Sequence, residues 1–229
     1  MRNKIDWPRI TVVTPSFNQG EFLEEAILSV LNQNYPNLEY FIIDGGSTDN
    51  SVNIVKKYSD KISWWVSEKD AGQSDAICKG FERANGDLIG WLNSDDVYFP
   101  GALMDIARAY VKNQTASLYL GAIATGDKNG RIRQCSVPSK PLPIFISFGL
   151  VAFGQPSTFF NAGLYRKVGG LNKGLYMRMD GDLIYRLLSH YPRAVVVNKM
   201  IAFFRWHETS KSTVSVDRYL KEQNEFTRS

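Results

Sequence analysis

The chain has 229 residues, of which 44% are hydrophobic and 22% are charged. These values are typical of a folded globular protein and exclude an intrinsically disordered chain. The formal net charge is +4, and the Lys and Arg residues are scattered, without a block of like charge. This distribution argues against nucleic-acid binding, because such binding needs clustered basic residues.

Three features of the sequence bear on where the protein resides. The two cysteines, Cys78 and Cys135, lie far apart and lack the spacing of a metal site, which indicates a reducing compartment. Residues 1–7 lack the apolar core of a signal peptide, and no apolar run approaches the roughly 20 residues of a membrane span. We therefore expect a cytoplasmic protein, and peripheral contact with the inner face of the membrane is left open.

Apolar strands alternate with helical patterns through the first half of the chain. The patterns predict strands over residues 10–14, 38–43, 62–66 and 88–92, and helices over residues 20–31, 47–58 and 76–84. Such alternation is typical of βαβ units, in which a helix connects two parallel strands. The sequence therefore predicts an α/β fold with a mostly parallel central sheet flanked by helices.

The second half of the chain is less regular. The patterns predict helices over residues 101–112 and 180–189, a hairpin with its turn at residues 127–130, and strands over residues 194–197 and 201–204. One α/β domain commonly reaches about 200–250 residues, and no low-complexity linker divides this chain. We therefore expect a single domain over residues 1–229.

Polar clusters follow four of the predicted strands. The clusters are residues 14–18 (TPSFN), 44–49 (DGGSTD), 67–73 (SEKDAGQ) and 93–96 (NSDD). Open parallel sheets bind ligands at the carboxyl ends of their strands, so these clusters are expected at one rim of the sheet. Crowded carboxylates repel each other unless a cation or hydrogen-bond donors offset their charge. The sequence thus indicates a polar binding site at this rim.

Asp95 and Asp96 are the strongest candidates for metal ligands. Adjacent carboxylates after a strand can also cap the helix that begins near Gly101. However, Mg²⁺ and Mn²⁺ prefer carboxylate oxygens, and they are often held by one or two of them together with substrate phosphates. An ion bound in this way stabilises a diphosphate leaving group. From the residues alone, the metal interpretation is favoured over the cap.

Two later clusters are open to more than one interpretation. Asp180 precedes an amphipathic helix, and the residues alone favour a helix cap over a general base. His207 follows a predicted strand, where a metal ligand and a structural side chain are equally supported. Arg205 and Lys211 in the same stretch are candidates for binding phosphate oxygens. Trp206, like Trp64, Trp65 and Trp91, is expected in the core rather than stacked on a base or sugar.

The ordered series of motifs resembles the family 2 glycosyltransferases. The series comprises residues 14–18 (TPSFN), 44–49 (DGGSTD), 70–72 (DAG), 86–87 (GD), 92–96 (LNSDD), 180–182 (DGD) and 204–207 (FRWH). The resemblance implies a GT-A fold, with a nucleotide-sugar-binding half over about residues 1–100 and an acceptor-binding half over about residues 101–229. It also implies an inverting glycosyltransferase of the bacterial surface-polysaccharide type. Such an enzyme moves a sugar from a nucleoside-diphosphate donor to a glycan or lipid-linked acceptor, with Mn²⁺ or Mg²⁺ as cofactor.

The resemblance further implies roles for individual residues. Those at the donor are Pro15, Asn18, Asp44, Asp70, Asn93, Ser94 and Asp95, with Asp44 on the base; those at the metal are Asp95, Asp96 and His207; those on the acceptor or phosphate side are Gln155, Arg205 and Lys211; and Asp180 is the catalytic base. Two positions depart from the family pattern. Asn93 stands where the first acid of the DxD motif is expected, and Met179 stands where many members carry an acid. Metal binding is therefore expected to depend on Asp95.

Two alternatives remain open. Sugar nucleotidyltransferases share this architecture, but they usually carry a glycine-rich basic loop after the first strand, and here no Arg or Lys occurs between Pro15 and Lys56. A catalytically degenerate nucleotide-sugar-binding module is the other alternative, because Asn93 replaces an acid. Release of pyrophosphate from a nucleoside triphosphate and a sugar phosphate would favour the first. Donor binding without transfer or hydrolysis would favour the second.

Overall fold

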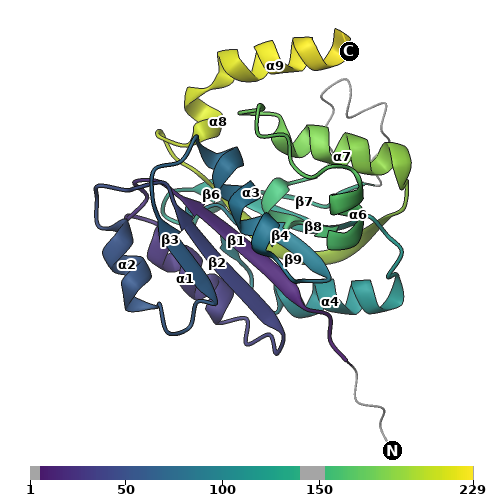
Figure 1. Ribbon diagram of the computed structural model, residues 1–229, viewed down its shortest axis with the longest axis horizontal. Helices are drawn as coiled ribbons and strands as arrows, with labels where there is room; N and C mark the ends of the chain where they lie inside the picture. The colour runs from purple at the N-terminus through teal and green to yellow at the C-terminus, as the bar shows by residue number, and fades with distance from the viewer. Residues whose placement is uncertain (1–5, 140–152, 229) are drawn as a thin grey trace, which may run out of the picture.

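The computed structural model describes residues 6–139 and 153–228 of the chain. The strands are β1 (Ile10–Ser16), β2 (Leu38–Asp44), β3 (Trp64–Ser67), β4 (Leu88–Trp91), β5 (Val97–Tyr98), β6 (Leu118–Asp127), β7 (Ile132–Ser136), β8 (Thr158–Asn161) and β9 (Ala194–Trp206). The helices are α1 (Leu23–Leu31), α2 (Ser51–Lys57), α3 (Gln73–Arg83), α4 (Ala102–Lys112), α6 (Ala162–Lys167), α7 (Met179–His190), α8 (Lys211–Val214) and α9 (Val216–Arg228), with a 3-10 helix η1 (Gln155–Ser157). Within the described residues these strands form one sheet in the order β3-β2-β1-β4-β8-β6-β9-β5, and β7 pairs with β6 (Figure 1).

The first half of the sheet is parallel, and the carboxyl ends of its strands form one rim. β1 pairs in parallel with β2 and β4, and β2 pairs in parallel with β3. The register aligns Ser16 with Asp44 and Asp44 with Ser67, so these three strands end at the same level. Every residue of β1 is buried, as expected for a central strand covered on both faces. The three polar clusters that follow these strands therefore start at one rim.

The second half of the sheet is mixed. β8 is antiparallel to both β4 and β6, and β5 is antiparallel to β9, whereas β6 and β9 run parallel. The β6–β7 hairpin has its turn where residues 127–130 predict it. β9 is one long strand rather than the two short predicted strands, because its pairing with β6 continues past a bulge at residues 198–199. The strands β8, β6, β9 and β5 thus extend the sheet from β4, beyond its parallel half.

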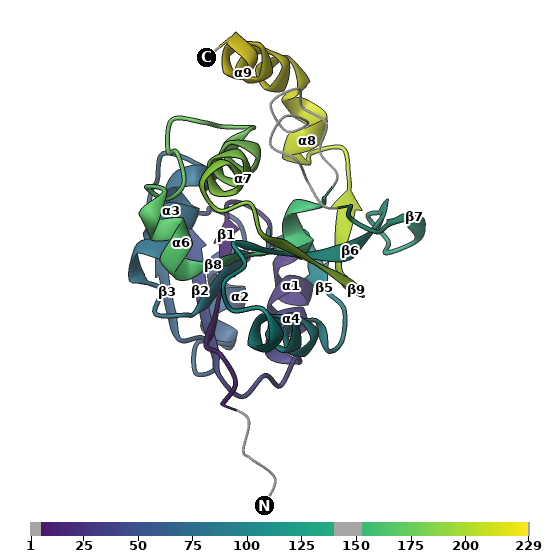
Figure 2. The same cartoon turned by 90° about the vertical axis from the view of Figure 1, so that its right-hand side faces the viewer.

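Helices cover both faces of the sheet (Figure 2). α1, α2 and α4 contribute to the core on one face, and α3, α6 and α7 contribute to the core on the other. Successive side chains of β1 point to opposite faces of the sheet, so Val12 packs in the first core and Val13 in the second. α3 approaches β1 so closely at Gly80 that an added Cβ would lie 2.6 Å from Cγ1 of Val13. The two layers leave the carboxyl ends of the parallel strands open.

The segment after β9 leaves the sheet. α8 and α9 lie beyond the carboxyl ends of the parallel strands, and α9 passes over α7 (Figures 1 and 2). None of the helices that the structure describes has the length and hydropathy needed to cross a bilayer. The carboxy-terminal helices therefore stand at the same end of the molecule as the binding rim.

Candidate active site

A cleft of about 1020 Å³ opens at the carboxyl ends of the parallel strands. The sequence-predicted site residues that line it are Pro15, Asp70, Asn93, Ser94, Asp95, Gln155, Asp180 and Lys211. They come from the ends of β1, β3 and β4 and from η1, α7 and α8. The fold thus brings Asp95 and Asp180, which are far apart in the sequence, to one cleft.

Asn18 and Asp44 are not among the described residues that line the cleft. The buried Asp44 carboxylate accepts hydrogen bonds from the Ser47 N–H at 2.9 Å and from the Ser67 hydroxyl at 2.6 Å. Asn18 has a left-handed backbone with φ of 52°, and its Oδ1 accepts a hydrogen bond from the Thr48 N–H at 2.8 Å. Both side chains therefore hold the loops after β1 and β2 together, and neither one is brought to the cleft wall.

Asp95 lines the cleft, and His207, which is not among the lining residues, lies directly beside it. Nε2 of His207 lies 2.9 Å from Oδ2 of Asp95, and Nδ1 lies 3.0 Å from the Thr209 hydroxyl. The imidazole also packs against the Phe22 ring, with 4.8 Å between the centroids. Two neighbouring ligands of an octahedral ion lie about 3 Å apart, since each is about 2.1 Å from the ion. The spacing of the Asp95 and His207 atoms fits this requirement.

Asp96 and Arg205 lie behind the cleft wall. Asp96 is fully buried; Oδ1 accepts a hydrogen bond from the Arg205 N–H at 3.0 Å, and Oδ2 accepts one from Nδ2 of Asn93 at 3.1 Å. Burial and the neighbouring Asp95 raise the pKa of Asp96 well above its usual value. The Arg205 guanidinium donates to the Asp95 carbonyl at 2.8 Å and to Oε2 of Glu25 at 2.5 Å. The pair therefore joins the end of β9 to the loop after β4, and the structure does not bring it to the cleft.

The described residues supply only part of a metal site. No group of three or more His, Cys, Asp or Glu side chains in residues 6–139 and 153–228 is arranged to hold an ion. Asp95 supplies one carboxylate with the His207 imidazole beside it, and Mg²⁺ sites commonly combine one or two carboxylates with substrate phosphates and water.

Hydrogen bonds through Gln73 join Asn93 to Lys211, and all three residues line the cleft. Gln73 is not among the predicted site residues. Oδ1 of Asn93 accepts a hydrogen bond from Nε2 of Gln73 at 2.7 Å, and Oε1 of Gln73 accepts one from Lys211 at 2.6 Å. Lys211 also donates to the Tyr176 carbonyl. Burial lowers the pKa of Lys211 to about 8, although the nearby Asp180 opposes this shift. The only sequence signal for Gln73 is its place in the polar cluster at residues 67–73.

Asp180 lies in the first turn of α7 and faces the cleft. Its Oδ1 accepts a hydrogen bond from the Gly181 N–H at 2.8 Å. Burial raises the pKa of Asp180, although Lys211 and Arg178 act in the opposite direction. Asp182 is instead paired with Arg186, whose Nη2 lies 2.6 Å from Oδ2. Of the two acids in the DGD motif, only Asp180 lines the cleft.

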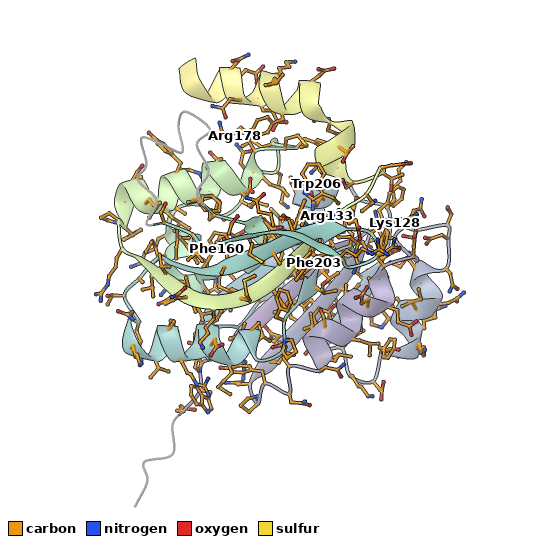
Figure 3. All side chains as sticks on the ribbon, turned by 180° about the vertical axis from the view of Figure 1, so that it is seen from behind. Lys128, Arg133, Phe160, Arg178, Phe203 and Trp206 are labelled. Atoms are coloured by element: carbon orange, nitrogen blue, oxygen red, sulfur yellow. The ribbon has the colours of Figure 1, made fainter. Side chains whose placement is uncertain are left out.

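Two exposed aromatic side chains also line the cleft. Trp206 is 50% exposed and Phe17 is 59% exposed. The expectation of a core position for Trp206 is therefore wrong, because β9 carries this residue past the cover of the helices to its end. Trp206 and Arg133 of β7 line a second, smaller hollow of about 500 Å³ next to the cleft (Figure 3). Neither aromatic residue was predicted as a site residue.

The fold is similar to those of two solved proteins, TarS and a mannosyltransferase. Residues 1–349 of TarS from S. aureus, in complex with UDP-GlcNAc, match with a TM-score of 0.72 and 18% identity, covering 90% of this chain and 61% of that chain. The mannosyltransferase PcManGT from Pyrobaculum calidifontis, in complex with GDP-Man and Mn²⁺, matches with a TM-score of 0.66 and 18% identity, covering 86% of this chain and 57% of that one. The protein therefore has the GT-A fold, which confirms the predicted fold class.

Sequence comparisons define the family. The model of glycosyl transferase family 2 matches residues 11–187. An uncharacterized glycosyltransferase of Rickettsia typhi is 32% identical over 189 residues, which cover 79% of this chain and 59% of the relative. One of Rickettsia felis is 26% identical over 204 residues, which cover 83% of this chain and 34% of the relative. The chain belongs to glycosyltransferase family 2, as the series of motifs predicts, and it spans a third to three-fifths of the length of these relatives.

Proposed function

We propose that the protein is an inverting glycosyltransferase that moves a sugar from a nucleoside-diphosphate donor to a hydroxyl of a glycan or lipid-linked acceptor. The observation that carries the proposal is that Asp95 and Asp180 line the same cleft. Its volume of about 1020 Å³ is at the upper end of small-molecule sites, which are roughly 300–1,000 Å³. Structures of similar fold hold UDP-GlcNAc or GDP-Man, which supports a nucleotide sugar as the donor.

The donor diphosphate is proposed to lie between Asp95 and Lys211. Asp95 and His207 would hold Mn²⁺ or Mg²⁺, and the ion would neutralise the charge that develops on the leaving diphosphate. Lys211 adds an ammonium group to the lining of the same cleft. Asn93 carries no charge and is held by Gln73, so its proposed part is to place the loop rather than to bind the ion.

Asp180 is proposed to act as the general base. It accepts the proton of the acceptor hydroxyl while that oxygen attacks the anomeric carbon and the bond to the diphosphate breaks. A single displacement of this kind inverts the anomeric configuration. Burial raises the pKa of Asp180, which makes it a stronger base than a solvated carboxylate. Because Asp182 is engaged by Arg186, one carboxylate of the motif serves the cleft, as a single displacement requires.

The variant Asp180→Asn tests this assignment. A general base contributes about 10²–10⁴-fold to the rate, so kcat for transfer should fall at least a hundredfold. The dissociation constant of the nucleoside diphosphate, measured by calorimetry, should stay within about twofold, because the amide keeps the shape of the side chain. Asp105→Asn, in the first turn of α4, is the matched control and should leave both quantities unchanged. Near-normal turnover of Asp180→Asn would contradict the proposal.

The family match favours a glycosyltransferase over a sugar nucleotidyltransferase. Both reactions act on nucleoside phosphates, so binding alone does not separate them. A nucleoside diphosphate among the products indicates transfer, whereas pyrophosphate formed from a nucleoside triphosphate and a sugar phosphate indicates nucleotidyl transfer. The proposal predicts the first product.

A further inference from the structure

Glu222 of α9 binds three consecutive backbone N–H groups. Its carboxylate accepts hydrogen bonds from the N–H groups of Tyr176 at 2.9 Å, Met177 at 2.8 Å and Arg178 at 3.0 Å. The residue is only 7% exposed. Burial alone would raise the pKa of Glu222, but these backbone donors outweigh it and lower the pKa. The carboxylate is therefore ionised at neutral pH.

The bound segment leads directly into the proposed catalytic helix. Residues 176–178 end where α7 begins, and Asp180 lies in the first turn of α7. No side chain caps this helix end at its N-cap residue, Arg178. A helix start without such a cap leaves N–H groups that need other acceptors. Glu222, from a different helix, accepts from the N–H of the N-cap residue Arg178 and from those of the two residues before it, so α9 holds the segment that leads into α7.

Further contacts from α9 hold the same segment. The guanidinium carbon of Arg218 lies 4.0 Å from the centroid of the Tyr176 ring, and Nε of Arg218 lies 3.4 Å from Glu222. Arg178 is buried between α7 and α9, where its guanidinium donates to Oε1 of Gln223 (Figure 3). α9 thus fixes both the backbone and the side chains of the segment.

Lys211, which is proposed to bind the donor diphosphate, also holds residues 176–178. Lys211 of α8 donates to the Tyr176 carbonyl and to Gln73, which in turn is bonded to Asn93. The residues after β9 therefore connect the diphosphate side of the cleft with the helix that carries the proposed base. Residues 211 and 222 both lie outside the region that the family model matches, which ends at residue 187.

We propose that Glu222 is a positioning residue, whose carboxylate fixes residues 176–178 and so places Asp180 against the acceptor hydroxyl. This inference rests on the proposed function, because it assumes that Asp180 is the base. A displacement of about 1 Å at a reacting group can cost about a hundredfold in rate. Loss of the Glu222 carboxylate should accordingly act on the chemical step rather than on donor binding.

The variant Glu222→Gln in the full chain tests the proposal. The amide keeps the shape of the side chain but replaces one acceptor oxygen with an NH₂ group, which cannot accept a backbone hydrogen bond. We expect kcat for transfer to fall 10–100-fold, while KM for the donor and the dissociation constant of the nucleoside diphosphate stay within twofold. Glu225→Gln, on an exposed position of the same helix, is the control and should match the wild type.

Two activity results would overturn the proposal. One is a kcat for Glu222→Gln equal to that of Glu225→Gln. The other is a parallel loss of kcat, donor affinity and melting temperature, which would mean that Glu222 only stabilises the fold.

Amide hydrogen exchange separates this proposal from the proposed function. In Glu222→Gln, exchange at Met177 and Arg178 should accelerate at least tenfold, whereas exchange at Leu187, deeper in α7, should be unchanged. Unchanged exchange at residues 176–178 would refute the role of Glu222 even if the wild type is active. A wild type without transferase activity would refute the proposed function, and it would do so whatever the exchange rates show.

Discussion

Lys211 is a residue whose charge should change within an accessible pH range. Burial lowers its pKa from 10.5 to about 8, so the folded protein loses the ammonium charge between these values while the unfolded chain keeps it. The lowered pKa affects both folding stability and ligand binding. Folding stability should rise from pH 8 towards pH 10.5, because the unfolded state binds more protons there. Attraction of a diphosphate to Lys211 should meanwhile be lost.

Nucleoside diphosphate binding should therefore weaken with pH. Between pH 7 and pH 9 a group with a pKa of about 8 changes from about nine-tenths to one-tenth protonated, so affinity should fall by up to about tenfold. Calorimetric titrations at several pH values in the presence of Mg²⁺ measure this. Lys211→Met should bind more weakly at pH 7 and show no such decline. A wild-type affinity that is flat over this range contradicts the placement of Lys211 at the diphosphate.

His207 should control the affinity of the site for a divalent cation. Its Nε2 lies 2.9 Å from Oδ2 of Asp95, so its removal takes away either a ligand or the group that orients Asp95. Loss of such a partner typically weakens metal binding about 10–100-fold. A Mn²⁺ titration of nucleoside diphosphate binding measures the effect in His207→Ala. His190→Ala, at the exposed end of α7, should behave as the wild type.

The sequence predicts which polar clusters meet at the cleft. It does not predict which side chains within each cluster face the cleft. Asp95 and Asp96 are adjacent acids, yet the strand end directs one towards the cleft and the other towards the Arg205 backbone. Asp44 is likewise held inside by the turn that follows it. Such choices depend on hydrogen-bond donors supplied from distant parts of the chain, and Arg205 follows Asp96 by more than a hundred residues. No local pattern encodes them.

At the scale of elements, the contact of α3 with β1 makes a direct prediction. Gly80→Ala would bring a Cβ to 2.6 Å from Val13, which is buried in the middle of a strand. Alanine usually favours a helix over glycine by about 1 kcal/mol, but overpacking a core costs about 1–3 kcal/mol. Chemical denaturation should therefore show a net loss of stability of up to about 2 kcal/mol. Gly163→Ala in α6, where an added Cβ has space, should show no loss.

The elements differ in how far their own residues predict them. α1 and α3 bury a helical stripe, and β1 is a fully buried strand rich in β-branched residues, so the local patterns suffice to predict them. The patterns do not predict β5, β8, α6, α8 or α9. β5 and β8 are too short to show a period. Their pairing depends on partner strands that are remote in the sequence, β9 for β5 and β4 for β8. α9 is rich in charged residues, and Glu222 holds it to the segment before α7 through contacts remote in the sequence.

For the molecule as a whole, the parallel half follows from βαβ connectivity, whereas the mixed half does not. Helical crossovers connect these parallel strands, which lie in the sheet in the order β3-β2-β1-β4. β8 enters between β4 and β6, where Ile89 pairs with Phe160 and Leu118 pairs with the same residue. This insertion joins the parallel half of the sheet, which ends in the loop of Asp95, to the mixed half. The local patterns do not predict that the acids from these two regions share a cleft, whereas the family resemblance implies it.

The most direct test of the account is a thermal-shift measurement with UDP and GDP, each with and without Mn²⁺. A ligand at a hundred times its dissociation constant stabilises the folded state by about 2.7 kcal/mol, which raises the melting temperature of a chain of this size by roughly 5–10 °C. We predict such a shift with one of the nucleotides and Mn²⁺ together, a smaller shift without Mn²⁺, and no effect of Mn²⁺ in Asp95→Asn. Equal shifts with and without Mn²⁺, or the same response in Asp95→Asn as in the wild type, would contradict a cation held by Asp95 at the diphosphate.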